Sequence, residues 1–221
     1  MTLETARIRA ICFDVDGTLS DTDDRWVARL AGWLRPLGWL RARRLARWLV
    51  MGMETPANWV YEMLDRLHLD DEAGRLADWL FRTGVGKSGR FTLIEGVDKL
   101  LAGLKERYPL AVVSARGEKD TLAFLEQFNL RGYFQAIATA HTCAHTKPFP
   151  HPVLWAAEQM GVEASACLMV GDTVVDIRAG KAAGAQTVGV LCGFGREKEL
   201  RRAGADLILE TTAQLGEVLA G

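Results

Sequence analysis

Short apolar runs alternate with amphipathic segments along most of this chain, and this alternation is the feature that most restricts its fold. Strand-like runs occur at residues 8–13, 110–114, 136–139, 167–170, 187–191 and 206–209. Between them, apolar residues recur at helical spacing near 97–107, around Leu125, and near 152–160 and 175–183. Because parallel strands need a crossover, which is usually a helix, the pattern predicts an α/β fold with a doubly wound parallel sheet covered by helices on both faces.

Residues 20–86 interrupt this pattern because they contain no strand-like run. Thr55 and Pro56 suit the first turn of a helix, and Trp59, Met63 and Leu67 then recur at four-residue steps. A chain of 221 residues is long for one domain and short for two independent ones. We therefore predict a core of residues 1–19 and 88–221, with residues 20–87 inserted as a helical cap domain.

Charge is balanced overall but unevenly distributed. The formal charge of -1 gives no general attraction to nucleic acid. Residues 25–53 nevertheless hold seven Arg and no Asp, Glu or Lys. Within this stretch, the Trp- and Arg-rich segment 33–50 has three interpretations: a solvated face of a cap helix, a basic lining that attracts an anionic substrate, or a surface for a membrane or a partner.

No apolar run is long enough to span a membrane, and the N-terminus lacks the apolar core of a signal peptide. These features predict a cytoplasmic protein. Its oligomeric state stays open.

Polar side chains follow four of the predicted strands. They are Asp14, Asp16, Thr18, Ser114, Lys147, Asp172 and Asp176. Ligands of open parallel sheets bind at the carboxyl ends of the strands, so we expect these residues to meet there. Converging carboxylates repel one another unless a cation neutralises them, and a set of oxygen ligands favours Mg²⁺.

The remaining polar groups of this set suit a phosphate. The Ser114 hydroxyl, the Lys147 ammonium and the backbone N–H groups of Gly17 and Thr18 could hold phosphate oxygens. One carboxylate would then attack phosphorus in line and form an aspartyl phosphate, while a second protonates the leaving oxygen and later activates water. The sequence thus predicts phosphoryl transfer.

The motifs that carry this chemistry resemble a known family in order and spacing. They are D-V-D-G-T at 14–18, Ser114, K-P-F-P at 147–150 and G-D-T-V-V-D-I-R-A-G-K-A-A-G-A at 171–185, followed by T-V-G-V-L-C-G-F-G at 187–195. This set resembles the haloacid dehalogenase-like hydrolase superfamily, in its phosphatase branch with a helical cap, of the phosphoglycolate phosphatase type. The resemblance implies a Rossmann-like core, Mg²⁺ as the cofactor and a small phosphorylated metabolite as the substrate.

The resemblance also implies a role for each matching residue. Asp14 matches the nucleophile, Asp16 the general acid and base, Ser114 and Lys147 the phosphate-binding positions, and Asp172 and Asp176 the acidic metal site, with Asp176 either a direct ligand or one step removed. Asp14 and the backbone carbonyl of Asp16 would complete the metal site. Dehalogenases lack an acid at the position of Asp16, so the resemblance favours a phosphatase.

Three questions stay open from the sequence. A phosphomutase would use the same aspartyl phosphate and pass the phosphate to another hydroxyl instead of water. A protein that binds a partner or a membrane through its Trp- and Arg-rich cap is a third interpretation. Arg116, two residues after Ser114, could contact substrate or cap the helix that follows it.

Overall fold

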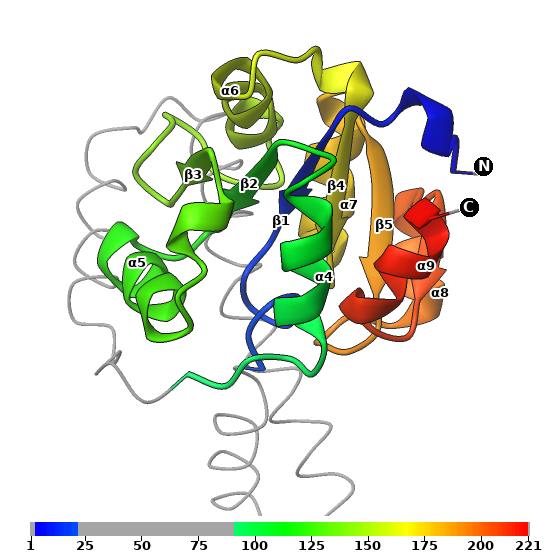
Figure 1. The fold of residues 1–221 in the computed structure, drawn as a ribbon. Coiled ribbons are helices and arrows are strands. Elements are labelled where there is room, and N and C mark those ends of the chain that lie inside the picture. The colour runs from blue at the N-terminus through cyan, green and yellow to red at the C-terminus, as the bar shows by residue number, and fades with distance from the viewer. Residues whose placement is uncertain (1–2, 22–90, 221) are drawn as a thin grey trace, which may run out of the picture. The chain divides into compact units, whose positions relative to one another are not determined.

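The computed structural model describes residues 3–21 and 91–220, and it contains a parallel sheet of six strands in the order β3-β2-β1-β4-β5-β6 (Figure 1). The strands are β1 (Ala10–Phe13), β2 (Leu110–Val113), β3 (Ala136–Ala138), β4 (Cys167–Gly171), β5 (Gln186–Val190) and β6 (Leu207–Leu209). Every neighbouring pair is parallel, and β1 lies between β2 and β4. The predicted α/β fold is confirmed.

Helices connect successive strands of the sheet, and one further α-helix follows β6. They are α4 (Val97–Leu104), α5 (Glu118–Gln127), α6 (His151–Gln159), α7 (Val174–Ala182), α8 (Glu197–Ala203) and α9 (Leu215–Ala220). The single-turn helices among the described residues are η1 (Thr5–Arg7), η3 (Arg131–Tyr133), η4 (Ala164–Ala166) and η5 (Thr212–Gln214). Helices α4, α5, α6 and α7 match the sequence prediction. Helix α8 was not predicted, because it buries only Leu200 and so shows no apolar repeat.

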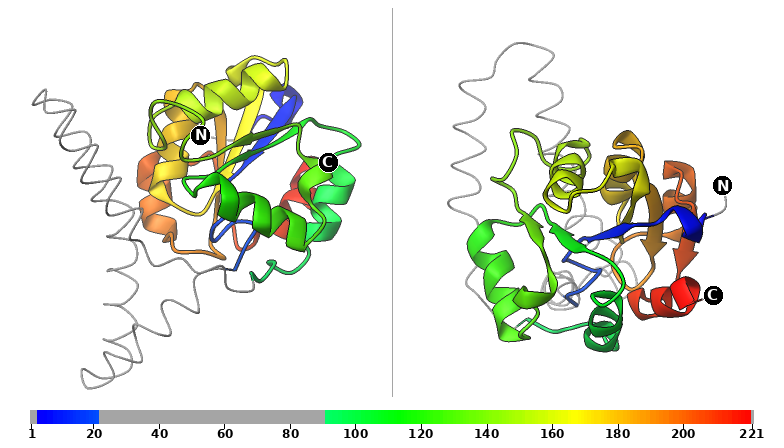
Figure 2. Two further views of the ribbon diagram at one scale, coloured as in Figure 1. Left: turned by 90° about the vertical axis from the view of Figure 1, so that its left-hand side faces the viewer. Right: turned by 45° about the horizontal axis from the view of Figure 1, so that its top comes forward.

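The two faces of the sheet carry different hydrophobic layers. Along β1, Ile11 and Phe13 join a cluster of large side chains that includes residues of α4, α5 and α9. Ala10 and Cys12 point to the other face, where they join a cluster built mainly of alanines with α6 and α7. The views in Figures 1 and 2 show these two sets of helices on opposite sides of the strands. The core is therefore doubly wound, with β1 buried on both faces.

The alanine-rich face lets α7 approach the sheet closely, and Gly180 is the point of contact. A methyl group on Gly180 would lie 2.6 Å from Thr187 Cγ2 and 2.9 Å from Met169 Cβ. We expect Gly180→Ala to lower the free energy of unfolding by about 1–3 kcal/mol, because overpacking outweighs the gain in helix propensity. Urea unfolding measures this change.

Gly103 in α4 provides the matched control, because no heavy atom would lie within 4 Å of the added methyl group. There the same substitution should raise the free energy of unfolding by up to about 1 kcal/mol. Equal effects at the two glycines would contradict the close packing of α7.

Residues on either side of the predicted insert are tied together in the core. The Ile94 N–H donates to the Leu19 carbonyl at 3.0 Å, and the Asp21 N–H donates to the Thr92 carbonyl at 2.8 Å. Ser20 and Leu93 form an antiparallel bridge between these bonds. The chain therefore leaves the core and returns to it through one paired junction.

The rest of the predicted cap, including the basic segment 33–50, lies outside the described residues. Across residues 3–21 and 91–220, no helix combines the length and apolar character needed to cross a membrane.

Candidate active site

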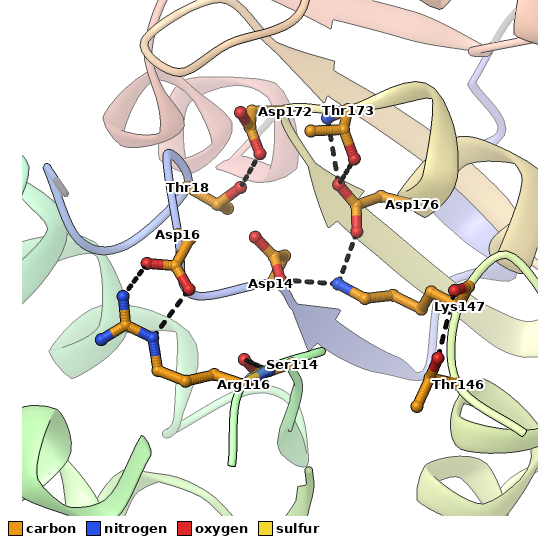
Figure 3. A network of polar contacts seen from close by, with 10 residues as sticks. All are labelled: Asp14, Asp16, Thr18, Ser114, Arg116, Thr146, Lys147, Asp172, Thr173 and Asp176. Atoms are coloured by element: carbon orange, nitrogen blue, oxygen red, sulfur yellow. Dashed lines mark hydrogen bonds and ion pairs between the residues drawn. The ribbon is translucent and has the colours of Figure 1, made fainter. Parts of the chain in front are cut away.

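Polar residues meet where the central strands end (Figure 3). Asp14 directly follows β1 and its N–H donates to the Val170 carbonyl at 2.9 Å. Ser114 follows β2 in the same way, and its N–H donates to the Ala138 carbonyl at 2.9 Å. These bonds continue the sheet by one residue, so the sheet itself fixes where both side chains start.

Lys147 occupies the centre of a buried cluster of carboxylates. Its Nζ lies 2.6 Å from Asp14 Oδ1 and 2.6 Å from Asp176 Oδ1. One oxygen from each of Asp14, Asp172 and Asp176 lies within 4.8 Å of the others, and all three residues are buried. The structure thus brings together three of the four residues that the sequence suggests for a metal.

The charges of this cluster do not balance. Burial raises the pKa of Asp14 to about 8, and Asp176 adds to this effect while Lys147 opposes it. Burial alone would lower the pKa of Lys147, but Asp14 and Asp176 raise it well above its usual value, so the ammonium stays charged. A single ammonium facing three carboxylates leaves negative charge uncompensated. Three hard oxygen donors with excess negative charge fit a divalent cation such as Mg²⁺.

Asp172 is held in place by backbone and side-chain donors. The Phe194 N–H donates to Asp172 Oδ2 at 2.7 Å, and the Thr18 hydroxyl lies 3.4 Å from Oδ1. A methyl group added at Gly17 or Gly193 would overlap this carboxylate. Gly17 also has a φ of 75°, a conformation that favours glycine. The glycines of both loops therefore make room for Asp172.

Asp176 is positioned by the first turn of α7. Its Oδ2 accepts hydrogen bonds from the Thr173 N–H at 3.0 Å and the Thr173 hydroxyl at 2.7 Å. The Asp176 backbone N–H also donates to the Thr173 side chain, and together these bonds form a capping box at the start of α7. This capping box orients the Asp176 side chain so that its Oδ1 contacts Lys147. The start of α7 and the geometry of the site therefore depend on the same side chain. The sequence predicted a role for Asp176 but none for Thr173.

The turn after Asp14 uses its own N–H groups. Gly17 N–H donates to the Ser20 carbonyl at 2.8 Å, and Thr18 N–H donates to the Val15 carbonyl at 3.3 Å. The phosphate contact predicted for these two groups would compete with the hydrogen bonds of the turn. The hydrogen bonds of the turn do not involve the side chains of Ser114 and Lys147, so a phosphate bound by these side chains would leave the turn intact.

Asp16 lies apart from the carboxylate cluster. Its Oδ2 accepts a hydrogen bond from Arg116 Nε at 2.9 Å, and its Oδ1 is paired with Arg116 Nη2. The metal contact predicted for Asp16 through its backbone carbonyl remains a prediction. Of the two roles left open for Arg116, helix capping is not the one seen, because Gly117 occupies the N-cap of α5.

Comparison with known proteins identifies the family. The family model described as haloacid dehalogenase-like hydrolase matches residues 11–190. The probable phosphatase IndB of Dickeya dadantii is 31% identical over 210 residues, which cover 93% of this chain and 90% of the relative. The phosphoglycolate phosphatase of Escherichia coli K12 is 27% identical over 239 residues, covering 94% of this chain and 91% of the relative.

A solved structure of a family hydrolase from Deinococcus radiodurans, with bound phosphate and sodium, has the same fold. Its TM-score is 0.72 at 24% identity, and the match covers 97% of this chain and 96% of the other. Matches in sequence and in fold thus both extend over nearly the whole chain. The chain therefore belongs to the haloacid dehalogenase-like hydrolases and is an enzyme of that family, with phosphatases among its named relatives.

Proposed function

We propose that this enzyme is a Mg²⁺-dependent phosphatase that hydrolyses a small phosphomonoester through an aspartyl phosphate on Asp14. The observation that carries the proposal is the contact of Lys147 Nζ with Asp14 at 2.6 Å, inside a buried cluster of three carboxylates. Such a cluster combines a nucleophile, a cation that can hold phosphate, and ligands for a second cation. The names of the relatives agree with this activity.

Asp14, Asp172 and Asp176 would hold the metal through carboxylate oxygens. When bound, Mg²⁺ would neutralise the charge of this cluster and that of the phosphoryl oxygens. Lys147 and Ser114 would bind those oxygens and orient phosphorus toward Asp14.

Asp14 and Asp16 divide the chemistry. A carboxylate oxygen of Asp14 attacks phosphorus, and the bond from phosphorus to the ester oxygen breaks as the new bond forms. Asp16 donates a proton to the departing oxygen and later removes one from a water molecule. That water attacks phosphorus, which releases inorganic phosphate and restores Asp14.

A screen of phosphorylated metabolites tests this function. We expect release of inorganic phosphate with Mg²⁺ present, a fall of at least about 100-fold in EDTA, and recovery when Mg²⁺ is added in excess. Release that resists EDTA would contradict the metal site. Isomerisation of a sugar phosphate without release of phosphate would instead indicate the phosphomutase alternative.

The same proposal indicates a partner and a cellular location for the enzyme. A small phosphorylated metabolite is the proposed partner, and a cytoplasmic location is proposed because its substrates would be there. The three interpretations of the basic segment 33–50 stay predictions, since the segment lies outside the described residues.

A further inference from the structure

Arg116 makes a specific contact at the site that the proposed chemistry does not use. Its guanidinium contacts both carboxylate oxygens of Asp16, and the two side chains are only 19% and 22% exposed. In Figure 3 this pair lies on the other side of Asp14 from Lys147. A fork of this kind fixes both the plane and the direction of a carboxylate, which a single hydrogen bond does not.

The backbone of Arg116 is tied to the ends of two strands. Its N–H donates to the Oγ of Ser114, which directly follows β2, at 3.1 Å. Its carbonyl accepts a hydrogen bond from the Ala140 N–H at 3.0 Å, in the segment that follows β3. Neither bond involves the Arg116 side chain, so a substitution of that side chain does not remove them.

The guanidinium itself lies against a ring that α5 fixes. Its central carbon is 5.2 Å from the centre of the Phe91 ring. The side-chain amide of Gln127 accepts from the Phe91 N–H at 3.2 Å and donates to the Phe91 carbonyl at 2.9 Å. The Phe91 ring packs edge to face on Phe124, with 5.7 Å between the ring centres. Arg116 therefore has a place in the core that does not depend on Asp16.

Asp16 differs from the other carboxylates of the site in its surroundings. The other three are buried, whereas Asp16 lies in the turn after β1 and is partly exposed. An aspartate side chain has two rotatable bonds, and a contact at both oxygens restricts both of them. The core thus fixes Arg116, and Arg116 in turn fixes the direction of the Asp16 carboxylate.

The fork is compatible with proton transfer by Asp16. A carboxylate offers about four acceptor positions on its two oxygens, and the fork occupies one on each. The fork alone therefore does not block proton exchange. In the proposed function, Asp16 has to place an oxygen against the leaving group. A carboxylate that is already aligned does so more often than one that rotates, and this difference in alignment changes the rate.

We propose that Arg116 is a positioning residue for Asp16, because it holds the carboxyl group in the orientation from which Asp16 passes a proton to the leaving oxygen. The inference rests on the proposed function and deepens it, since it adds a residue that acts through Asp16 and not on the substrate. Loss of Arg116 should matter most where the leaving group needs a proton. It should matter little once Asp16 can no longer supply one.

Two aromatic phosphomonoesters with different leaving groups test the first of these expectations. p-Nitrophenolate is weakly basic and departs without a proton, whereas the alkoxide of benzyl alcohol needs one. The quantity to compare is kcat/KM, because it covers the steps up to departure of the leaving group and excludes the later attack of water. In Arg116→Gln it should fall by about 10–100-fold for benzyl phosphate and by less than about threefold for p-nitrophenyl phosphate. Arg116→Lys keeps the charge and should recover part of the loss on benzyl phosphate.

A double-mutant cycle tests whether Arg116 acts through Asp16. Asp16→Asn keeps the shape of the side chain but cannot transfer a proton, so it should lower kcat/KM for benzyl phosphate by at least about 100-fold. Adding Arg116→Gln to Asp16→Asn should then lower it by no more than about twofold further. A residue that bound the substrate directly would show a similar loss in both backgrounds. The same cycle applies to any metabolite that the screen identifies.

Arg201 on α8 is the matched control. Its Nε and Nη2 also pair with a carboxylate, that of Glu197, at 2.9 and 2.7 Å, but this pair is exposed. Arg201→Gln should leave kcat/KM unchanged for both esters. Melting temperatures, measured first, show whether each variant is folded. If Arg116→Gln is not, Arg116→Lys carries the same comparison with a smaller expected loss.

The outcomes separate the positioning role from the function beneath it. An equal fall on the two esters, no fall on either, or a fall that persists in full beside Asp16→Asn would overturn the positioning role and leave the phosphatase intact. No phosphate release by native enzyme from either ester or from any metabolite of the screen would overturn the function and this inference together.

Discussion

Asp14→Asn is expected to reduce phosphate release by at least about 10⁴-fold while the chain stays folded. The amide has the shape of the carboxylate but cannot form the acyl phosphate. Asp14 directly follows β1 and, in the proposed function, carries the attack on phosphorus, so no other residue of the cluster should replace it. Steady-state kinetics with Mg²⁺, together with melting curves, measure both parts of the expectation.

Asp206→Asn is the control for the same Asp-to-Asn exchange at a partly buried ion pair away from the site. Asp206 lies next to β6 and accepts hydrogen bonds from Lys181 and from the Thr187 N–H, the latter at 2.8 Å. This variant should lose stability but keep its kcat, because Asp206 takes no part in the proposed chemistry. Native enzyme quenched in acid during turnover should carry phosphate on the protein, and Asp14→Asn should carry none. Activity of Asp14→Asn within tenfold of native would sink the assignment of the nucleophile.

Lys147→Met should cause the second large loss, in activity and in stability. The Lys147 side chain is 4% exposed and its ammonium pairs with two carboxylates, so its removal leaves buried negative charge without a partner. We expect kcat/KM to fall by about 10³-fold or more, and the free energy of unfolding without metal to fall by about 3–5 kcal/mol. Mg²⁺ should then stabilise Lys147→Met more than native protein, because it supplies the missing positive charge.

Lys181→Met provides the comparison for this loss. Lys181 also forms an ion pair, with Asp206, but its side chain is 29% exposed and it contacts one carboxylate. Its removal should cost about 1 kcal/mol and leave kcat unchanged. If Lys147→Met behaved like Lys181→Met in both measurements, the central role of Lys147 would be refuted.

The fold and the acidic cluster follow from local signals in the sequence. Strands β1, β2 and β4 are runs of buried apolar residues, and both Asp14 and Ser114 come directly after such a run. In a parallel sheet, this position alone brings them to the same edge. Helices α8 and α9 are too short for a repeat to show, and the packing of their few buried leucines determines them instead.

Contacts between distant segments could not be predicted in this way. Arg116 and Asp16 are separated by 100 positions, and Phe194 and Asp172 by 22. Acidic residues such as Glu118 follow Arg116 closely in the chain, and nothing in the sequence indicates that Arg116 pairs with the distant Asp16 instead. A backbone N–H such as that of Phe194 leaves no trace in the residue type. The resemblance to a known family predicted which residues react but did not indicate the residues that hold them in place.

The paired junction of Leu19–Asp21 with Thr92–Ile94 has an evolutionary consequence. The junction closes a loop in the chain. The entropic cost of closing a loop grows only slowly with the number of residues that it encloses. Lineages could therefore lengthen, shorten or exchange the enclosed segment without altering a single strand of the sheet. The strands and the acidic residues that follow them can then stay unchanged while the enclosed segment changes, because the chain passes between the two parts only through one short pair of backbone segments at this junction.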